Sequence, residues 1–404
     1  MATVSAERPG AGQAATTVAL CCFAAICEGF DIQSMGVAAP SLAPALHLTR
    51  GQLGPAFSAS TVGLLIGAIV LGRLADSVGR KWTLAASLGL LGAFSLLTPL
   101  SWNLPSLLII RLFAGVGLGG AMPNLIALAS EAVAPRLQAS FVAISAATLP
   151  LGGSLASAVA VGLDWRTIFE VGGMTPLAIA VVTGLMMPES RRFLVARADS
   201  SARPGLAHVY FGGGRALASV MLWLAAFCVL LVLFLLLNWL PLLMGAKGLS
   251  KPQAALVSVL FNIGGFVGAL IIATAFQRTG RAGVFIVWWV GMAASIAALA
   301  YAPAHFAAAG AAGFAAGFFI SSAPTGLYAL APDFYDVPIR GAGLGGVIGV
   351  GRIGAILGPL LAGALIAGGK DARGVVLALL PFVAVAAAAT FVALSRRAAT
   401  LASY

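Results

Sequence analysis

The chain has 404 residues, of which 60% are hydrophobic and only 9% are charged, and its formal net charge is +11. A soluble domain carries roughly 25% charged residues, because its surface faces water. So little charge cannot cover a soluble surface of this size, and we expect lipid to be the solvent for most of it. The Lys and Arg residues are scattered in short loops between apolar runs, which favours a role in membrane orientation over nucleic-acid binding.

Long apolar runs recur along the whole chain. About 20 apolar residues are needed to cross a bilayer as a helix, and runs of that length predict an all-α membrane protein with twelve transmembrane helices. Their approximate bounds are 16–40, 53–72, 82–101, 104–130, 138–163, 167–187, 216–241, 253–276, 282–302, 305–331, 341–369 and 373–395.

The longest polar interruption, at residues 188–215, divides the chain into two halves. We predict a six-helix bundle at 1–187, a cytoplasmic central loop, and a second six-helix bundle at 216–404. Most Lys and Arg residues fall on inner loops if both termini are cytoplasmic, which predicts that orientation for a multi-pass membrane protein. We expect the membrane to be the bacterial inner (plasma) membrane. Two similar halves related by an axis along the membrane normal are the plan of a large transporter class, in which the solute binds between the halves.

The loop after the second predicted helix, residues 72–81, reads GRLADSVGRK. It resembles the signature loop of the major facilitator superfamily, whose fold is two pseudo-symmetric six-helix bundles. The resemblance implies gating roles for three residues: Asp76 at the start of the eleventh helix in an outward-facing state, and Arg80 beside Glu131 of the fourth helix. A carboxylate at a helix N-terminus is stabilised by the helix dipole. The second-half copy, at residues 277–281, departs from this pattern because it lacks the acid.

Residues 28–34, EGFDIQS, resemble the first-helix signature of the aromatic acid:proton symporter family of that superfamily. Glu28 and the segment 327–332 are similar to its 3-(3-hydroxyphenyl)propionate transporter branch. Further matching segments are 111–119, 122–124, 188–190, 238–241 and 351–354. The resemblance implies import of a small aromatic carboxylate by alternating access, with protons as the coupling ion.

Charged side chains inside a bilayer are costly, so those within the predicted spans are candidate functional residues. Glu28 and Asp31 are three residues apart and are expected to share one helix face. From a rise of about 1.5 Å per residue, Asp31 and Arg111 lie at similar depths, which predicts an ion pair if the first and fourth helices adjoin. If Arg111 holds Asp31 ionised, Glu28 is the acid more easily protonated near neutral pH, whereas a mobile arginine could swap the roles. We predict that the three residues couple protons; the alternative is a static buried ion pair.

Arg352 lies on the eleventh predicted helix, at nearly the depth of Glu28 but in the opposite half. Its planar guanidinium suits a carboxylate, so we predict that it anchors the substrate; the alternative is an internal pair. We expect Glu28, Arg111 and Arg352 to face a central cavity. Further substrate-site candidates are Asn238, Asn262 and Tyr328, which could bond a ring hydroxyl, and Phe30 and Trp239, which could stack on the ring.

Other functions compete with import. A proton-coupled exporter of small organic solutes is the nearest alternative, but residues 148–153 lack the Gly-Pro dipeptide of the exporter motif. A membrane enzyme would need a nucleophile and base or metal ligands, and the sequence shows no His/Cys cluster, so we predict no catalytic residue, no metal and no cofactor. A sensor would be expected to append a signalling domain. We predict a transporter that is functional as a monomer in the lipid bilayer and does not bind nucleic acid.

Overall fold

The computed structural model describes residues 11–132, 135–187, 189, 206–278, 280–336 and 339–402. Within these residues the chain is helical and has no strand. The helices of the N-terminal half are α1 (Ala11–Ala45), α2 (Arg50–Val78), α3 (Arg80–Leu97) with η1 (Thr98–Leu100), α4 (Leu104–Ala132), α5 (Pro135–Gly162) and α6 (Trp165–Met186).

The C-terminal half begins with a short helix that precedes the long ones. Its elements are α8 (Leu206–Phe211), η2 (Gly212–Gly214), α9 (Ala216–Ala246), α10 (Lys251–Arg278), α11 (Arg281–Tyr301), α12 (Phe306–Ala316), η3 (Gly317–Ser321), α13 (Ala323–Leu330), η4 (Ala331–Phe334), α14 (Arg340–Ala367), α15 (Ala372–Leu377) and α16 (Leu380–Ala402).

The predicted spans correspond to these helices. In the part of the chain that the structure describes, eleven helical segments are long and apolar enough to cross a membrane, and α5 contributes a shorter apolar stretch, Thr148–Gly162. One span is broken where a straight helix was expected: a π-helical turn, η3, separates α12 from α13. Pro324 follows this turn and cannot donate an N–H to the carbonyl four residues earlier, which disfavours a continuous helix. The structure also adds α8 within the predicted central loop.

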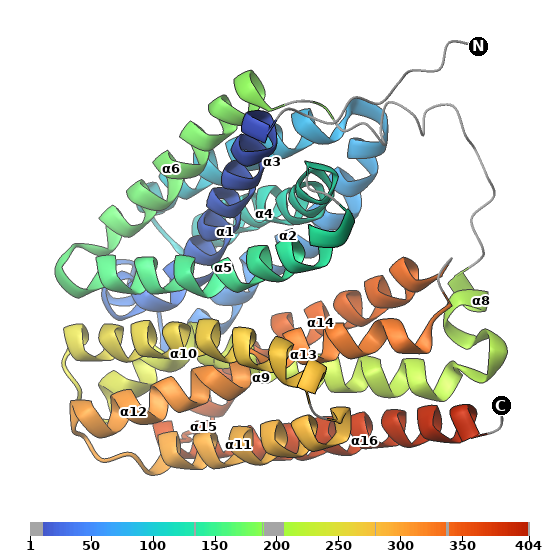
Figure 1. Cartoon of the computed structure of the whole chain (residues 1–404). Helices are drawn as coiled ribbons and strands as arrows, with labels where there is room; N and C mark the ends of the chain where they lie inside the picture. Colours follow the sequence, from blue (N-terminus) through green and yellow to red (C-terminus); the bar gives the residue numbers. More distant parts are fainter. Residues whose placement is uncertain are drawn as a thin grey trace.

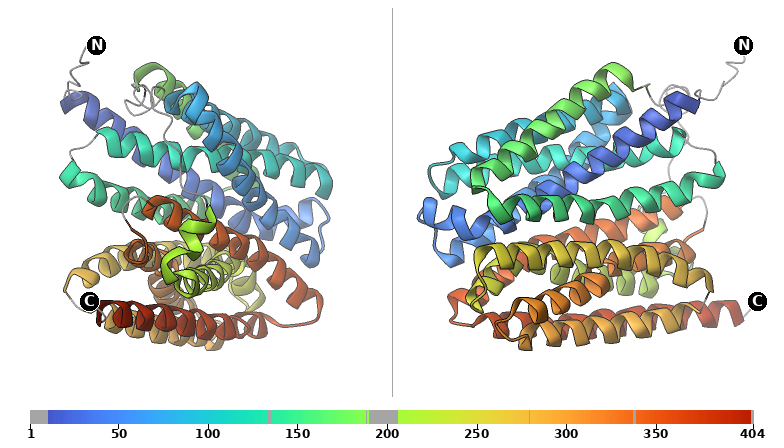
Figure 2. Two further views of the ribbon diagram at one scale, coloured as in Figure 1. Left: turned by 90° about the vertical axis from the view of Figure 1, so that its right-hand side faces the viewer. Right: turned by 60° about the vertical axis from the view of Figure 1, so that its left-hand side comes forward.

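The helices form two bundles that face one another (Figure 1). Helices α1 to α6 make the upper bundle in that view and α9 to α16 the lower one, and both views in Figure 2 keep them apart in the same way. The start of α1 and the end of α16 lie at the same end of the molecule. We call this the inner end, following the orientation predicted from Lys and Arg, and the opposite end the outer end.

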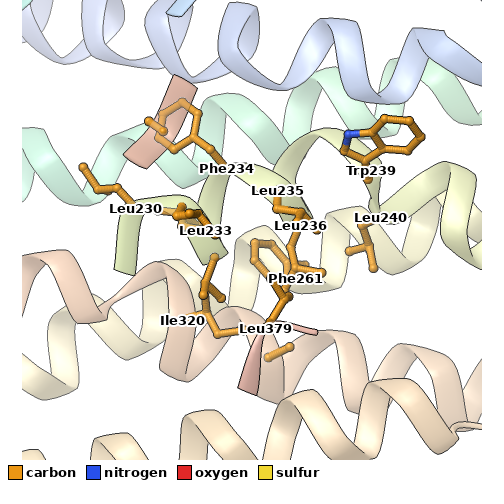
Figure 3. Packing of buried hydrophobic residues seen from close by; sticks show 14 of the residues in the cluster. Leu230, Leu233, Phe234, Leu235, Leu236, Trp239, Leu240, Phe261, Ile320 and Leu379 are labelled. Carbon is orange, nitrogen blue, oxygen red and sulfur yellow. The ribbon is translucent and has the colours of Figure 1, made fainter. Parts of the chain in front are cut away.

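The helix α9 is the core of the C-terminal bundle (Figure 3). Leu235, Leu236 and Trp239 are at most 1% exposed, and Phe261 of α10 packs against the same helix. Helix α14 approaches α9 closely because Gly354 has no side chain: a Cβ there would overlap the carbonyl oxygen of Phe227. Small residues serve this purpose in membranes, where helices associate by packing rather than by exclusion of water.

The two halves are joined at the outer end. A Cβ on Gly54 of α2 would lie 3.1 Å from the carbonyl oxygen of Pro359 of α14. The Ser58 hydroxyl of α2 donates a hydrogen bond to the carbonyl oxygen of Ile356, at 2.8 Å. These contacts form a tight seam between α2 and α14.

Towards the inner end the same two helices separate. Gly72 of α2 and Gly345 and Gly349 of α14 continue the faces that form the seam, because each lies a whole number of turns from it. A Cβ added at any of the three would meet nothing within 4 Å. The structure is therefore closed at the outer end and open at the inner end.

This packing predicts different effects for two valines on α14. Gly354→Val should destabilise the protein by about 1–3 kcal/mol, because the added methyl groups force α14 away from α9. Gly349→Val is the matched control, and should leave the thermal unfolding midpoint in detergent unchanged, because its Cβ points into open space. Equal midpoints for the two variants would contradict the described packing.

Candidate functional site: a cavity between the two halves

A cavity of about 890 Å³, counted with its open mouth, lies between the two bundles. Helices from both halves line it, and most of its wall is apolar. The polar and charged side chains in its wall are Glu28, Gln33, Asn262, Ser321, Thr325, Tyr328 and Arg352. A concave, largely apolar space with a few polar groups is the usual form of a small-molecule site.

Glu28 of α1 and Arg352 of α14 bring opposite charges to this cavity from opposite halves. Glu28 is 1% exposed, and its Oε2 has no hydrogen-bond partner among the described residues. A buried carboxylate oxygen without a partner is costly, so it is available to a proton or to a solute. Among the described residues no hydrogen bond or ion pair holds the guanidinium of Arg352, which lines the cavity together with Glu28 and Tyr328.

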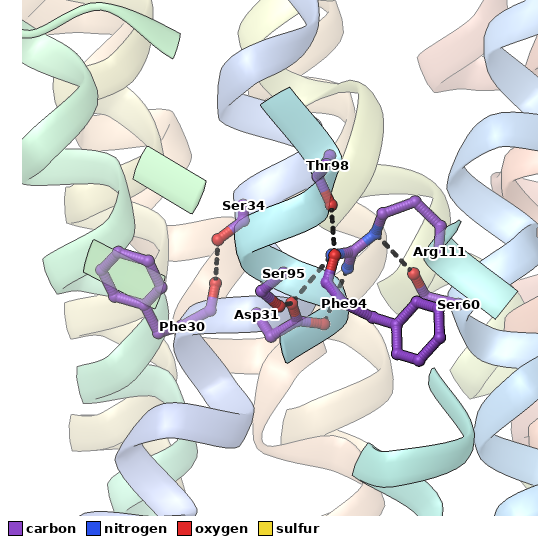
Figure 4. A network of polar contacts seen from close by, with 8 residues as sticks. All are labelled: Phe30, Asp31, Ser34, Ser60, Phe94, Ser95, Thr98 and Arg111. Atoms are coloured by element: carbon purple, nitrogen blue, oxygen red, sulfur yellow. Dashed lines mark hydrogen bonds and ion pairs between the residues drawn. The ribbon is translucent and has the colours of Figure 1, made fainter. Parts of the chain in front are cut away.

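Asp31 of α1 and Arg111 of α4 form a buried ion pair (Figure 4). Arg111 donates from Nη1 to Asp31 Oδ1 at 3.0 Å and from Nη2 to Asp31 Oδ2 at 2.7 Å. Ser95 donates to Asp31 Oδ1 at 3.1 Å, and Arg111 Nε donates to Ser60 at 2.9 Å. The ion pair predicted from helix depths is therefore present, and its hydrogen-bonding groups are well satisfied.

The sequence predicts that Arg111 faces the central cavity and that Glu28 and Asp31 share one face of α1. Asp31 and Arg111 line a smaller pocket that Phe234 and Asn238 of α9 also line, so it lies between the two halves, and it shares Ile32 and Phe234 with the cavity. Three residues of helix leave the two side chains about 60° apart. The two side chains therefore share one face of α1, with Glu28 lining the cavity and Asp31 lining the adjoining pocket beside α3 and α4.

Two of the softer substrate-site candidates, Asn262 and Tyr328, line the central cavity. Asn262 Nδ2 donates to the carbonyl oxygen of Ser258 at 2.9 Å and to Gln33 Oε1 at 3.3 Å. Both residues come from the C-terminal half, like Arg352. A ring hydroxyl could therefore be bonded by the same half that carries the positive charge.

The other three candidates lie elsewhere. Trp239 is 1% exposed, and its indole N–H donates to the carbonyl oxygen of Pro359 at 3.1 Å. Phe30 is buried against α6, at Gly172. Asn238 lines the small pocket beside the ion pair instead of the cavity. These placements do not support contact with a solute in the central cavity.

Of the predicted gating residues, the side chains of Asp76 and Glu131 lie outside the part that the structure describes. The backbone N–H groups of Arg80 and Lys81 both donate to Glu189 Oε1, at 2.8 and 3.0 Å. This carboxylate thereby satisfies free donors at the start of α3. Glu189 belonged to a matching segment of the sequence, at 188–190, but sequence analysis gave it no role.

Two helical bundles around a shared charged cavity, in a chain with many apolar spans, define a multi-pass membrane transporter. The family model of the Major Facilitator Superfamily matches residues 21–250 and 222–402. The chain belongs to this family, as the loop at 72–81 indicated, and it is a transporter and not an enzyme.

Known proteins resemble the chain over nearly its whole length. It is 41% identical to the 3-(3-hydroxy-phenyl)propionate transporter of Escherichia coli (strain K12), over 94% of each chain. It is 34% identical to the 4-hydroxybenzoate transporter PcaK of Pseudomonas aeruginosa, over 92% of this chain and 90% of that one. The crystal structure of a D-xylose-proton symporter superposes with a TM-score of 0.74 at 17% identity, covering 93% of this chain and 96% of that one, which shows the shared fold.

The buried ion pair yields a stability prediction. Asp31→Asn should destabilise the protein by about 3–5 kcal/mol, because it leaves the Arg111 guanidinium buried without a counter-charge. Replacing both residues, as Asp31→Leu with Arg111→Met, should recover most of the thermal stability in detergent. A double variant no more stable than Asp31→Asn alone would show that the pair is not the source of the loss.

Proposed function

We propose that this transporter imports a small aromatic carboxylate together with a proton by alternating access. The observation that carries the proposal is the pairing of Glu28 and Arg352 in one cavity, from opposite halves of the molecule. A free acid and a free guanidinium in a shared cavity can bind a proton and a carboxylate together. The substrates in the printed names of the two relatives, a hydroxyphenylpropionate and a hydroxybenzoate, share a carboxylate and a hydroxylated ring.

The cavity wall offers separate partners for a charged part and an apolar part of the substrate. Arg352 offers a fork of N–H donors that matches a carboxylate. Asn262 and Tyr328 can bond a ring hydroxyl, and Leu233 and Phe234 of α9 supply apolar wall for the ring. Each functional group of a hydroxylated aromatic acid thereby finds a chemically matched partner.

Proton coupling requires a site whose protonation depends on substrate occupancy, since binding without that link gives only facilitated diffusion. Glu28 suits this role because it lines the cavity and keeps an unpaired oxygen. Ionised Glu28 repels a substrate anion, so protonation favours binding and binding favours protonation. Both oxygens of Asp31 instead accept hydrogen bonds from Arg111, and one of them also accepts from Ser95.

Alternating access is supported by the seam between α2 and α14, which is closed at the outer end and open at the inner end. In the opposite state we propose that the inner halves of these helices meet, with Asp76, Arg80 and Glu131 as gating residues. The protein is proposed to act as a monomer in the bacterial inner membrane, with both termini in the cytoplasm.

The direct test is uptake into proteoliposomes with an imposed pH gradient, acidic outside, across a panel of aromatic acids. Hydroxylated aromatic carboxylates should accumulate against their gradient, and the corresponding primary amides should not. Accumulation of solute only when protons leave the proteoliposome as the solute enters would instead identify an exporter.

A variant of the proposed coupling acid separates its role from binding. Glu28→Gln should abolish accumulation driven by the pH gradient, because an amide cannot exchange a proton at physiological pH. Counterflow of labelled for unlabelled substrate should persist, since it needs no net proton movement. If the variant still accumulates substrate normally, the coupling role moves from Glu28 to Asp31.

A variant of the proposed anchor tests the carboxylate contact. Arg352→Ala should raise the Kd of the acid at least tenfold, because charge-assisted hydrogen bonds contribute about 1.5–3 kcal/mol each. The control is the substrate's primary amide, which cannot form the ion pair and should bind the wild type and the variant alike. An equal loss of affinity for both compounds would assign Arg352 a structural role.

A further inference from the structure

The side chain of Gln33 makes a polar contact between the two halves. Its Nε2 on α1 donates a hydrogen bond to the carbonyl oxygen of Leu237 on α9, at 2.8 Å. Gln33 is 1% exposed, so the bond lies in a low-dielectric environment where it is strong. An amide buried inside a membrane-spanning segment needs such partners, and it finds them across the interface.

The Leu237 carbonyl can accept this hydrogen bond because a proline lies four residues further along α9. In an α-helix, the carbonyl of Leu237 would accept the N–H of residue 241. Residue 241 is Pro241, which has no N–H. The Leu237 oxygen is therefore left without its helical donor inside an apolar segment, where an unsatisfied carbonyl is costly. Gln33 supplies the missing donor from the other half.

The other end of the same amide is also engaged. Gln33 Oε1 accepts a hydrogen bond from Asn262 Nδ2 of α10, at 3.3 Å. One turn further along α1, a Cβ on Gly36 would lie 2.7 Å from the same Leu237 oxygen, so the two helix backbones are in contact there. Gln33 thus lies at the boundary between the cavity that it lines and the closed outer end.

We propose that Gln33 is an outer latch: its bond to the Leu237 carbonyl holds the outer end closed and has to break each time that end opens. This inference requires alternating access but no particular substrate or proton coupling. Gln33 acts here by positioning the two halves, and it need not contact the transported solute.

The latch predicts how the two states respond to its removal. Gln33→Leu takes away the donor and leaves the Leu237 carbonyl buried and unsatisfied in the inward-open state. In the outward-open state, α1 and α9 have separated and water can reach that oxygen. The substitution therefore raises the free energy of the inward-open state alone, and the population shifts outward.

The shift can be measured by cysteine labelling without substrate or pH gradient. In a background that has Cys21, Cys22, Cys27 and Cys228 replaced, one reporter is Ser58→Cys, buried in the outer seam and 4% exposed. The other reporter is Gly345→Cys, on the separated inner part of α14. These reporters are labelled with a membrane-impermeant maleimide, from the outside for position 58 and in inside-out vesicles for position 345.

With Gln33→Leu, labelling at position 58 should rise about tenfold, the effect of one buried hydrogen bond, and labelling at position 345 should fall. Ser34→Ala is the matched control, because in the described part of the chain the Ser34 hydroxyl bonds only within α1, to the Phe30 carbonyl oxygen. It should leave both rates unchanged. Unchanged labelling at position 58 with Gln33→Leu would refute the latch, as would an equal rise at both reporters, which indicates loosening of the fold.

A second variant identifies the acceptor. Pro241→Ala restores an N–H that can pair with the Leu237 carbonyl inside α9. By itself it should raise labelling at position 58, because the closed state no longer gains from the Gln33 donor. In that background Gln33→Leu should change labelling by less than about twofold. A tenfold change that persists in the Pro241→Ala background would show that Gln33 does not act through this carbonyl. Because no solute is present, these outcomes do not depend on the proposed substrate.

Discussion

The ion pair between Asp31 and Arg111 organises the N-terminal half. Two opposite charges in a low-dielectric interior have to remain together, because separating them leaves each one buried and uncompensated. Here Asp31 also accepts a hydrogen bond from Ser95 of α3, and Arg111 donates one to Ser60 of α2. The ion pair thereby connects α1 and α4 to both of these helices. The pair therefore holds four helices of the N-terminal bundle, α1 to α4, together.

The same ion pair distinguishes the two acids of α1, because it engages Asp31 and not Glu28. Asp31 has its oxygens occupied by Arg111 and Ser95, whereas Glu28, one turn earlier on α1, has an oxygen with no partner among the described residues. The proposed coupling between proton and substrate rests on this difference. The C-terminal half contributes the complementary charge, Arg352, so that a bound carboxylate would add a contact between the two halves across the cavity.

In the proposed alternating-access cycle, movement between the two halves is confined to their interface. Close packing within each half, as at Gly354, contrasts with an interface between α2 and α14 that closes only over its outer part. Small residues allow such helices to meet closely in one state and to separate in the other, because little side-chain rearrangement is needed. In the proposed cycle, polar contacts such as that of Gln33 set the balance between the two states.

Much of this could be predicted from the sequence. Apolar runs give the spans, and a rise of about 1.5 Å per residue was enough to place Asp31 beside Arg111. The rotation of α1 was harder, because a difference of about 60° between Glu28 and Asp31 decides which one faces the cavity, and no periodic apolar stripe reveals it in a helix surrounded by protein and lipid.

Other features depend on contacts between distant segments. An aromatic side chain such as Trp239 suits a cavity wall and a packed core equally well, so its burial beside Pro359 could not be predicted from its type. The contact of Gln33 does have a local signal, since Pro241 within an apolar run leaves a carbonyl free. That signal identifies the acceptor but not the donor from the other half.

Proton uptake on substrate binding tests the central claim most directly. Purified protein in weakly buffered detergent solution near neutral pH is mixed with hydroxylated aromatic carboxylate, and a pH indicator records the protons bound. The account predicts proton uptake that saturates with substrate in the wild type and is lost in Glu28→Gln at full occupancy. Binding by the wild type without proton uptake, or uptake that persists in the variant, would contradict it.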